Sequence, residues 1–133
     1  MTHLRRVLIL LALPAAVATP VALAAGNGGY KGKVSGDQAM SLKVKNNRLT
    51  SFKASIYASC GYQNFNITVA YPPAGKRGQT AKIRNNRFKV VFKGDPSVDD
   101  KRTVTGTFRG SKVSGRIKVE GTCSAKGTYS AKR

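Results

Sequence analysis

The segment Val44–Leu49, "VKNNRL", returns almost unchanged at Ile83–Phe88 as "IRNNRF". In both copies two asparagines separate one run of alternating apolar residues from the next. A two-residue β-hairpin loop needs positive φ at its central residues, and asparagine tolerates that conformation better than any residue except glycine. A looser third copy, "FRGSKV" at Phe108–Val113, has Gly-Ser at the loop. The repeat therefore predicts a hairpin turn, used at least three times.

Apolar residues alternate with polar ones through most of the remaining chain, which is the period-two pattern of half-buried strands. The spacing of three between Leu49 and Phe52 predicts a β-bulge at Thr50-Ser51. Gly106 and Gly115 fall on inward-facing positions in mid-strand, which predicts close packing or sharp sheet curvature. The fold class is therefore all-β: a small antiparallel β-sandwich or up-and-down β-barrel of about nine short strands built from hairpins.

The residues that flank each hairpin loop are basic, so like charges should face each other across the strands. Directly opposed like charges are unfavourable by up to about 1 kcal/mol. They are either screened by water or retained because an anion binds there. The sequence leaves both interpretations open. The candidate anion-binding residues are Lys45 with Arg48, Arg84 with Arg87, and Arg109 with Lys112.

The first 24 residues predict a cleaved secretory signal peptide. A short basic start precedes the apolar run Val7–Ala18, which is too short to span a bilayer, and Ala22-Leu23-Ala24 fits the small-x-small cleavage pattern. Arg5-Arg6 resembles a twin-arginine signal only loosely. The expected product is one exported domain, Ala25–Arg133, without a transmembrane segment.

Both cysteines, Cys60 and Cys123, lie in the predicted exported domain, and two cysteines allow one intramolecular pairing. We expect a disulfide between them rather than a reactive thiol, since neither has a neighbouring histidine or a CxxC partner. If every strand reversed direction, the two cysteines would lie at opposite ends of the sheet. The bond therefore implies a crossover, a non-reversing connection or an additional strand.

Composition argues against most enzymes and for an acidic partner. Cleavage would remove the only histidine and two of the 24 Lys+Arg, leaving 22 bases against 5 acids, or +17. Without histidine, Ser-His-Asp and Cys-His catalysis and histidine-ligated metals are excluded from that domain. A charge of +17 exceeds the magnitude of about 2 to 8 that solubility needs in a small domain. We expect no catalytic residues and no cofactor.

Two further segments hold weaker candidates. The loop "GDPSVDD" contains Asp95, Asp99 and Asp100, but its spacing differs from that of a calcium-binding loop, so a solvated connection is the stronger interpretation. A carboxylate hydrolase would need a partner across a cleft, for which only Asp37 and Glu120 remain.

The strand end "YASCGYQNFN" is the best candidate for a recognition loop, because aromatic rings flanked by amides suit sugars or bases. Its candidate residues are Tyr57, Tyr62, Gln63 and Asn64. The loop Pro72–Gln79 is a second candidate, with two prolines and two glycines.

The function these features favour is a non-enzymatic, secreted or envelope-associated module. It would bind cell-wall polymer, acidic polysaccharide, lipid headgroups or nucleic acid through basic strand faces and hairpin ends. The alternative is a recognition or inhibitor protein that contacts a specific protein or sugar through the Tyr57–Asn66 and Pro72–Gln79 loops. The sequence names no specific protein partner.

Overall fold

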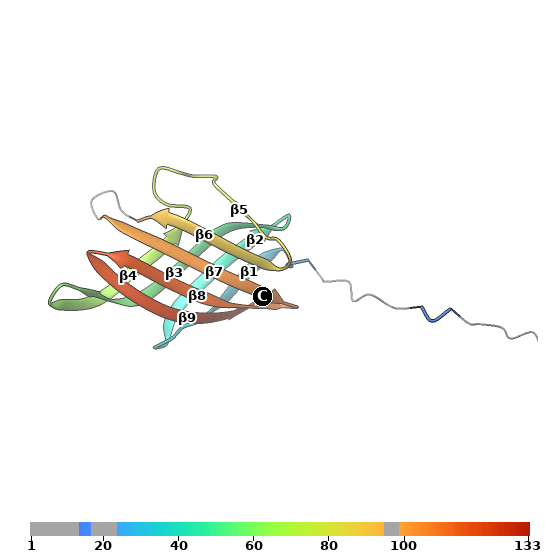
Figure 1. The fold of residues 1–133 in the computed structure, drawn as a ribbon, viewed down its shortest axis with the longest axis horizontal. Helices are drawn as coiled ribbons and strands as arrows, with labels where there is room; N and C mark the ends of the chain where they lie inside the picture. Colours follow the sequence, from blue (N-terminus) through green and yellow to red (C-terminus); the bar gives the residue numbers. More distant parts are fainter. Residues whose placement is uncertain (1–13, 17–23, 95–98) are drawn as a thin grey trace, which may run out of the picture.

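The structure is a computed structural model that describes residues 14–16, 24–94 and 99–133. Within these ranges the fold is all-β, as predicted, with nine strands in one antiparallel sheet (Figure 1). The strands are β1 (Gly28–Val34), β2 (Gln38–Lys45), β3 (Arg48–Cys60), β4 (Gln63–Tyr71), β5 (Ala81–Lys82), β6 (Arg87–Lys93), β7 (Asp100–Arg109), β8 (Lys112–Gly121) and β9 (Cys123–Lys132).

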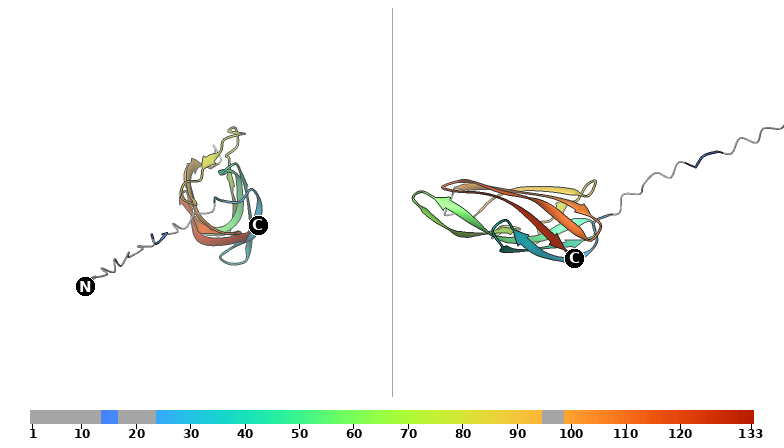
Figure 2. Two further views of the ribbon diagram at one scale, coloured as in Figure 1. Left: turned by 90° about the vertical axis from the view of Figure 1, so that its right-hand side faces the viewer. Right: turned by 90° about the horizontal axis from the view of Figure 1, so that it is seen from below.

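The sheet has the order β4-β3-β2-β1-β9-β8-β7-β6, with the short β5 paired to β3. Beyond the tip of the β1–β2 hairpin, the end of β3 pairs directly with the start of β9. This pairing closes a small barrel of four strands, β1, β2, β3 and β9, and the other strands pack outside it. Seen end-on, the strands wrap around a common interior (Figure 2).

Asparagine supplies the predicted turns. Asn46, Asn47, Asn85 and Asn86 all have φ between 50° and 60°. At the third hairpin Gly110 has φ 59°, which matches a loop with glycine first. The two copies of the repeated motif also lie side by side, because the Asn47 side-chain amide donates to the Ile83 carbonyl at 3.0 Å. The repeated asparagines of the motif therefore have a structural role, in forming the turns and in joining the two copies.

The predicted bulge is present. Val44 pairs with Leu49 while Lys43 pairs with Ser51, which leaves Thr50 as the extra residue. The Thr50 hydroxyl donates to the Lys43 carbonyl at 3.2 Å. Because the bulge adds one residue to the strand, Leu49 and Phe52 both point into the core although they are three positions apart.

One apolar core fills the interior, with buried residues from all the strands except β5. Aromatic pairs join strands that are distant in the sheet order: Tyr30 of β1 lies 5.4 Å from Phe108 of β7, and Tyr71 of β4 lies 5.5 Å from Phe92 of β6, between ring centroids. Tyr129 is buried and donates its hydroxyl to the Thr105 carbonyl at 2.7 Å. Burial raises the pKa of this phenol.

Gly106 and Gly115 pair with each other and make room for Tyr129. A Cβ at Gly106 would lie 2.6 Å from the Tyr129 hydroxyl, and one at Gly115 would overlap the Thr105 carbonyl. The predicted close packing is therefore confirmed.

Replacement of Gly115 by alanine should lower the free energy of unfolding by about 1–3 kcal/mol, because the added methyl group meets backbone that has little room to move. Gly29→Ala is the matched control, since a Cβ there has no atom within 4 Å. Urea unfolding of both variants measures the difference. Equal stability of the two would contradict the packing role of Gly115.

The predicted disulfide is present: Cys60 of β3 and Cys123 of β9 are directly opposed and bonded. They meet at one end because β4 and β5 run in the same direction along β3, separated by the loop 72–80. The non-reversing connection is thus the correct one of the three possibilities. The end of the sheet that holds the bond is called the disulfide end below.

The opposite end is called the hairpin end, and it holds the Asn46-Asn47, Asn85-Asn86 and Gly110-Ser111 loops. Strands β2, β5 and β7 all run toward it, as their antiparallel partners require.

The predicted signal peptide lies almost entirely outside the described residues, and the first buried core residue is Ala25. In the described ranges there is no helix long and apolar enough to cross a membrane.

Candidate anion-binding surface

The three like-charged pairs face each other as the sequence predicted. Lys45 is opposite Arg48, Arg109 is opposite Lys112, and Arg84 forms an isolated bridge with Arg87. All six lie at the hairpin end, and all are exposed except the half-buried Arg48. The fold therefore gathers into one region bases that are up to 67 positions apart in the sequence, from Lys45 to Lys112.

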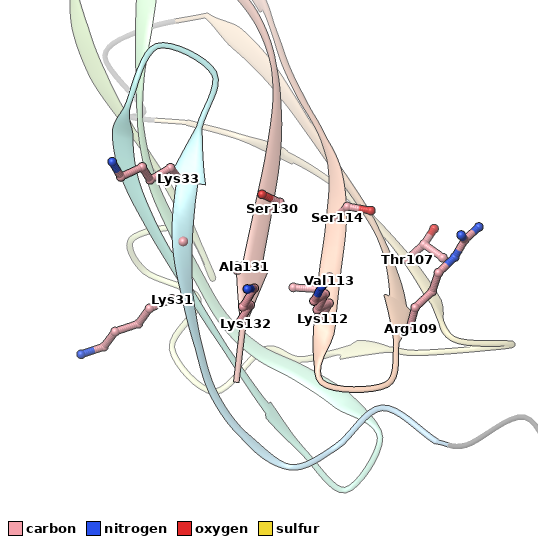
Figure 3. A pocket seen from close by; sticks show the side chains of 11 residues that line it. Lys31, Lys33, Thr107, Arg109, Lys112, Val113, Ser114, Ser130, Ala131 and Lys132 are labelled. Carbon is pink, nitrogen blue, oxygen red and sulfur yellow. The ribbon is translucent and has the colours of Figure 1, made fainter.

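Four bases form a continuous row across four neighbouring strands. Lys31 of β1 is opposite Lys132 of β9, Lys132 is opposite Lys112 of β8, and Lys112 is opposite Arg109 of β7. Figure 3 shows their side chains at one level of the sheet. Adjacent strands are about 4.8 Å apart, so this basic row spans about 15 Å. The row contains three opposed like-charged pairs in succession.

A second row, of hydroxyl groups, runs beside the first. Ser130 of β9 is opposite Ser114 of β8, and Ser114 is opposite Thr107 of β7. Both rows line a surface depression of about 530 Å³. The depression exists because the residues beside the bases are small, and because Gly32 lets β1 approach β9 so closely that a Cβ would overlap the Ser130 carbonyl. Cations and hydroxyl groups thus line one shallow surface, with Lys31 and Arg109 at its two sides (Figure 3).

The acidic residues lie at the other end of the molecule. Each of the four that the structure describes has a basic partner within 4 Å: Lys33 with Asp37, Lys93 with Asp99, Arg102 with Asp100, and Lys118 with Glu120. The hydrogen bond from Lys118 lowers the pKa of Glu120. Among the described residues, none of the bases of the basic row has an acidic partner. The positive field is therefore concentrated at the hairpin end.

Arg48 differs from the other hairpin bases because it also has a structural role. Its Nε donates to the Thr80 hydroxyl at 2.6 Å, which fastens the end of the loop 72–80 to β3. Burial raises the pKa of Tyr71, and the nearby Arg48 guanidinium partly offsets that rise. Arg48 is therefore less available to a ligand than its opposed partner Lys45.

The acidic loop is built around an ion pair. Both oxygens of Asp100 accept hydrogen bonds: Oδ1 from the Gly94 backbone at 2.8 Å, and Oδ2 from Arg102 Nε and Nη2 at 3.1 and 3.0 Å. Asp99 is exposed, and Asp95 lies outside the described residues. In the part of the chain that the structure describes, no group of three acidic, histidine or cysteine side chains is placed to hold a metal ion.

The two predicted recognition loops lie apart. Tyr57, Tyr62, Gln63 and Asn64 belong to the β3–β4 hairpin at the disulfide end, where all four are exposed. The loop Pro72–Gln79 follows Tyr71, which pairs with Phe52. Phe52 is eight residues before Cys60, or about 25 Å along the strand. The two loops therefore do not form a single site.

The sequence reasoning missed the basic row as a unit. It paired bases only within each hairpin, and it did not connect Lys31 or Lys132 with them. The row depends on the pairing of β9 with β1 and β8, which joins the two ends of the chain. The sequence did contain a sign of it: Tyr129 and Ala131 alternate as inward residues, which places the following Lys132 on the outward face.

Comparison of the chain with protein-family models, curated proteins and solved structures finds no match.

Proposed function

We propose that this protein is a non-enzymatic module that binds linear polyanions across the basic row at its hairpin end. The single observation that carries the proposal is the succession of Lys31, Lys132, Lys112 and Arg109 on four adjacent strands. Opposed like charges cost free energy in the unliganded fold, and a bound anion removes that cost. Four cations in line match a chain of repeating negative charges better than a single small anion.

The remaining bases of the hairpin end extend the same field. Lys45 and Arg84 are exposed, and Arg87 is opposite Thr107, beside the hydroxyl row. Hydroxyl groups donate hydrogen bonds to phosphate, sulfate and carboxylate oxygens alike, so the surface suits any of these chemistries. Cell-wall polymer, acidic polysaccharide and nucleic acid are the ligand classes this surface fits, and binding requires no cofactor.

We further propose that the protein is exported and acts outside the cell or at its envelope. The disulfide supports an oxidising compartment, since such bonds form and persist there. The predicted signal peptide provides the route. An extracellular location also places the basic row among anionic polymers of the envelope.

Reversal of alternate charges in the row tests the proposal. Lys31→Glu with Lys112→Glu gives the order Glu, Lys, Glu, Arg across the four strands, which should leave the fold intact and remove the site. We expect affinity for heparin and for DNA to drop steeply, and the slope of log affinity against log salt to flatten by about two.

Two matched variants carry the same change in net charge. Lys45→Glu with Arg87→Glu alters hairpin bases outside the row, and each new glutamate still faces an arginine. Lys89→Glu with Lys126→Glu alters strand faces outside the depression. Equal losses of polyanion affinity in all three double variants would show that the whole basic surface attracts the ligand and that the basic row is not a distinct site. Unchanged retention on both polyanions at physiological salt would overturn the proposed function.

A further inference from the structure

The outer edge of β4 is unusual for a soluble protein. β4 is a terminal strand of the sheet, and no described segment pairs along this edge. Of the strands that the structure describes, β4 alone has no charged residue. Exposed strand edges are ordinarily protected by lysine, proline or bulges, because their free backbone groups pair readily with another chain. The other terminal strand, β6, follows this rule with Arg87, Lys89 and Lys93.

The backbone groups on this edge can be assigned. Arg102 Nη1 donates to the Thr68 carbonyl at 2.8 Å, so the backbone groups of Thr68 point away from β3. In an antiparallel strand alternate residues point to the same side. Asn66 and Asn64 therefore also present their N–H and C=O groups outward, and both residues are exposed. The Thr68 carbonyl already accepts from Arg102, whereas no described residue hydrogen-bonds to the outward backbone groups of Asn66 or Asn64.

Apolar side chains accompany these free groups. The β3–β4 hairpin projects beyond the neighbouring strands (Figures 1 and 2). Phe65 lies opposite Ala58 and on the same face, yet it is 45% exposed because the hairpin extends past the core. Tyr57, on the other face, is 62% exposed, and Tyr62 stands free at the tip. The projecting segment Tyr57–Asn66 has no charged residue.

We propose that a second copy of this chain pairs with the β4 edge, strand to strand and antiparallel, with Phe65 facing Phe65 of the copy. In that register Asn64 of one copy and Asn66 of the other exchange backbone hydrogen bonds on both sides of the two-fold axis. The two phenylalanines occupy the non-hydrogen-bonded position between them, where opposed side chains are closest. The pairing uses only backbone groups to which no described residue hydrogen-bonds.

The distribution of charge favours a copy of the same chain in this arrangement. Two strongly basic molecules repel, so a stable pair must keep their cations apart. Antiparallel pairing at the disulfide end directs the two hairpin ends, with their basic rows, to opposite extremes of the dimer. It brings together the ends where the described carboxylates neutralise neighbouring bases.

Salt distinguishes this association from polyanion binding. Screening weakens the repulsion between two basic molecules, so dimerisation in the absence of polyanion should strengthen as salt is raised. Polyanion binding should weaken under the same change. Sedimentation equilibrium of the oxidised protein over a range of concentrations and salt should show a monomer–dimer equilibrium with the first of these trends.

Complementary charges at position 65 test the register. Phe65→Lys and Phe65→Glu, each alone, should sediment as monomers, because like charges then face each other across the axis. An equimolar mixture of the two should recover the mass of a dimer. Val91→Lys and Val91→Glu are the matched controls, since Val91 is an exposed apolar residue on β6, the other terminal strand, and they should dimerise as the unmodified protein does.

A monomeric mass for the unmodified protein at every concentration and salt would overturn the proposal. So would a dimer that survives Phe65→Lys, or a mixture of the two Phe65 variants that stays monomeric. Circular dichroism of each variant establishes that it is folded. Neither result bears on the charge-reversal test of the basic row, so the two proposals fail separately.

Discussion

Replacing Cys60 and Cys123 together by alanine should lower the free energy of unfolding by about 4 kcal/mol. The bond closes a sequence separation of 63 residues, and on the chain-entropy model a loop of that length gives a stabilisation of this size. For a domain of about 110 residues the melting temperature should fall by roughly 15–25 °C. Thermal unfolding of the oxidised, reduced and double-alanine proteins measures the effect.

The chemistry of the bond gives an independent control. The denatured, unreduced protein should contain no titratable thiol, since both cysteines are bonded. Amide hydrogen exchange should locate the loss of stability in the reduced protein. The short pairing of β3 with β9 should lose protection from exchange before the hairpin end does. Two reactive thiols per chain, or a reduced protein that melts with the oxidised one, would contradict the structural role of the bond.

Removing the guanidinium of Arg102 should have a comparable effect. Its partner Asp100 has a side chain only 1% exposed, and Arg102 itself is 12% exposed. Arg102→Met keeps the aliphatic bulk but leaves a buried carboxylate without its partner, which should lower the free energy of unfolding by about 3–5 kcal/mol. The variant also loses the hydrogen bond from Arg102 to Thr68, which ties β7 to β4 where the sheet has no backbone pairing.

Double-mutant analysis separates the orphaned charge from the lost contact. Arg102→Met combined with Asp100→Leu should be less destabilised than Arg102→Met alone, because no buried charge remains. Asp37→Asn is the matched control at the exposed Lys33–Asp37 pair and should leave stability nearly unchanged. If Arg102→Met unfolds no more readily than Asp37→Asn, the network around Asp100 does not hold β4 and β7 together.

The local features of the fold could be predicted because each has a local cause. Two-residue loops with asparagine at positive φ, the bulge at Thr50, and the inward glycines Gly106 and Gly115 all follow from spacing along one strand or hairpin. The opposition of Lys45 with Arg48 follows from the turn itself. In each case the residues that decide the geometry are within a few positions of one another.

The candidate site was only half predicted, because it depends on which strands become neighbours. Lys112 and Arg109 are joined by a hairpin, whereas Lys31 and Lys132 are opposed only because the last strand pairs with the first. Period-two patterning indicates which face a residue occupies but not which strand lies beside it. The same limit applies to β5, whose two residues continue the line of β4 along β3 after a nine-residue loop, 72–80.

The Asp100–Arg102 pair was also beyond sequence reasoning. The spacing and turn residues around Asp95, Asp99 and Asp100 favoured a solvated connection, whereas Asp100 is buried at the start of β7, where a charge is costly unless it is paired. The pair is satisfied by the Gly94 amide and the Thr68 carbonyl, which come from two other parts of the chain. A buried ion pair of this kind can be recognised only from the structure, because its additional hydrogen-bond partners, here Gly94 and Thr68, come from elsewhere in the chain.

The separation of charge along the molecule gives it a permanent electric dipole. Cations without a described acidic partner lie at the hairpin end and the described carboxylates at the disulfide end, so the dipole runs along the length of the sheet. Near an anionic surface the field exerts a torque as well as an attraction, and the molecule rotates until its hairpin end faces the surface. In that orientation the aromatic tip of the monomer, at Tyr62, points into solution, which leaves the β4 edge of the oriented molecule accessible to a second copy.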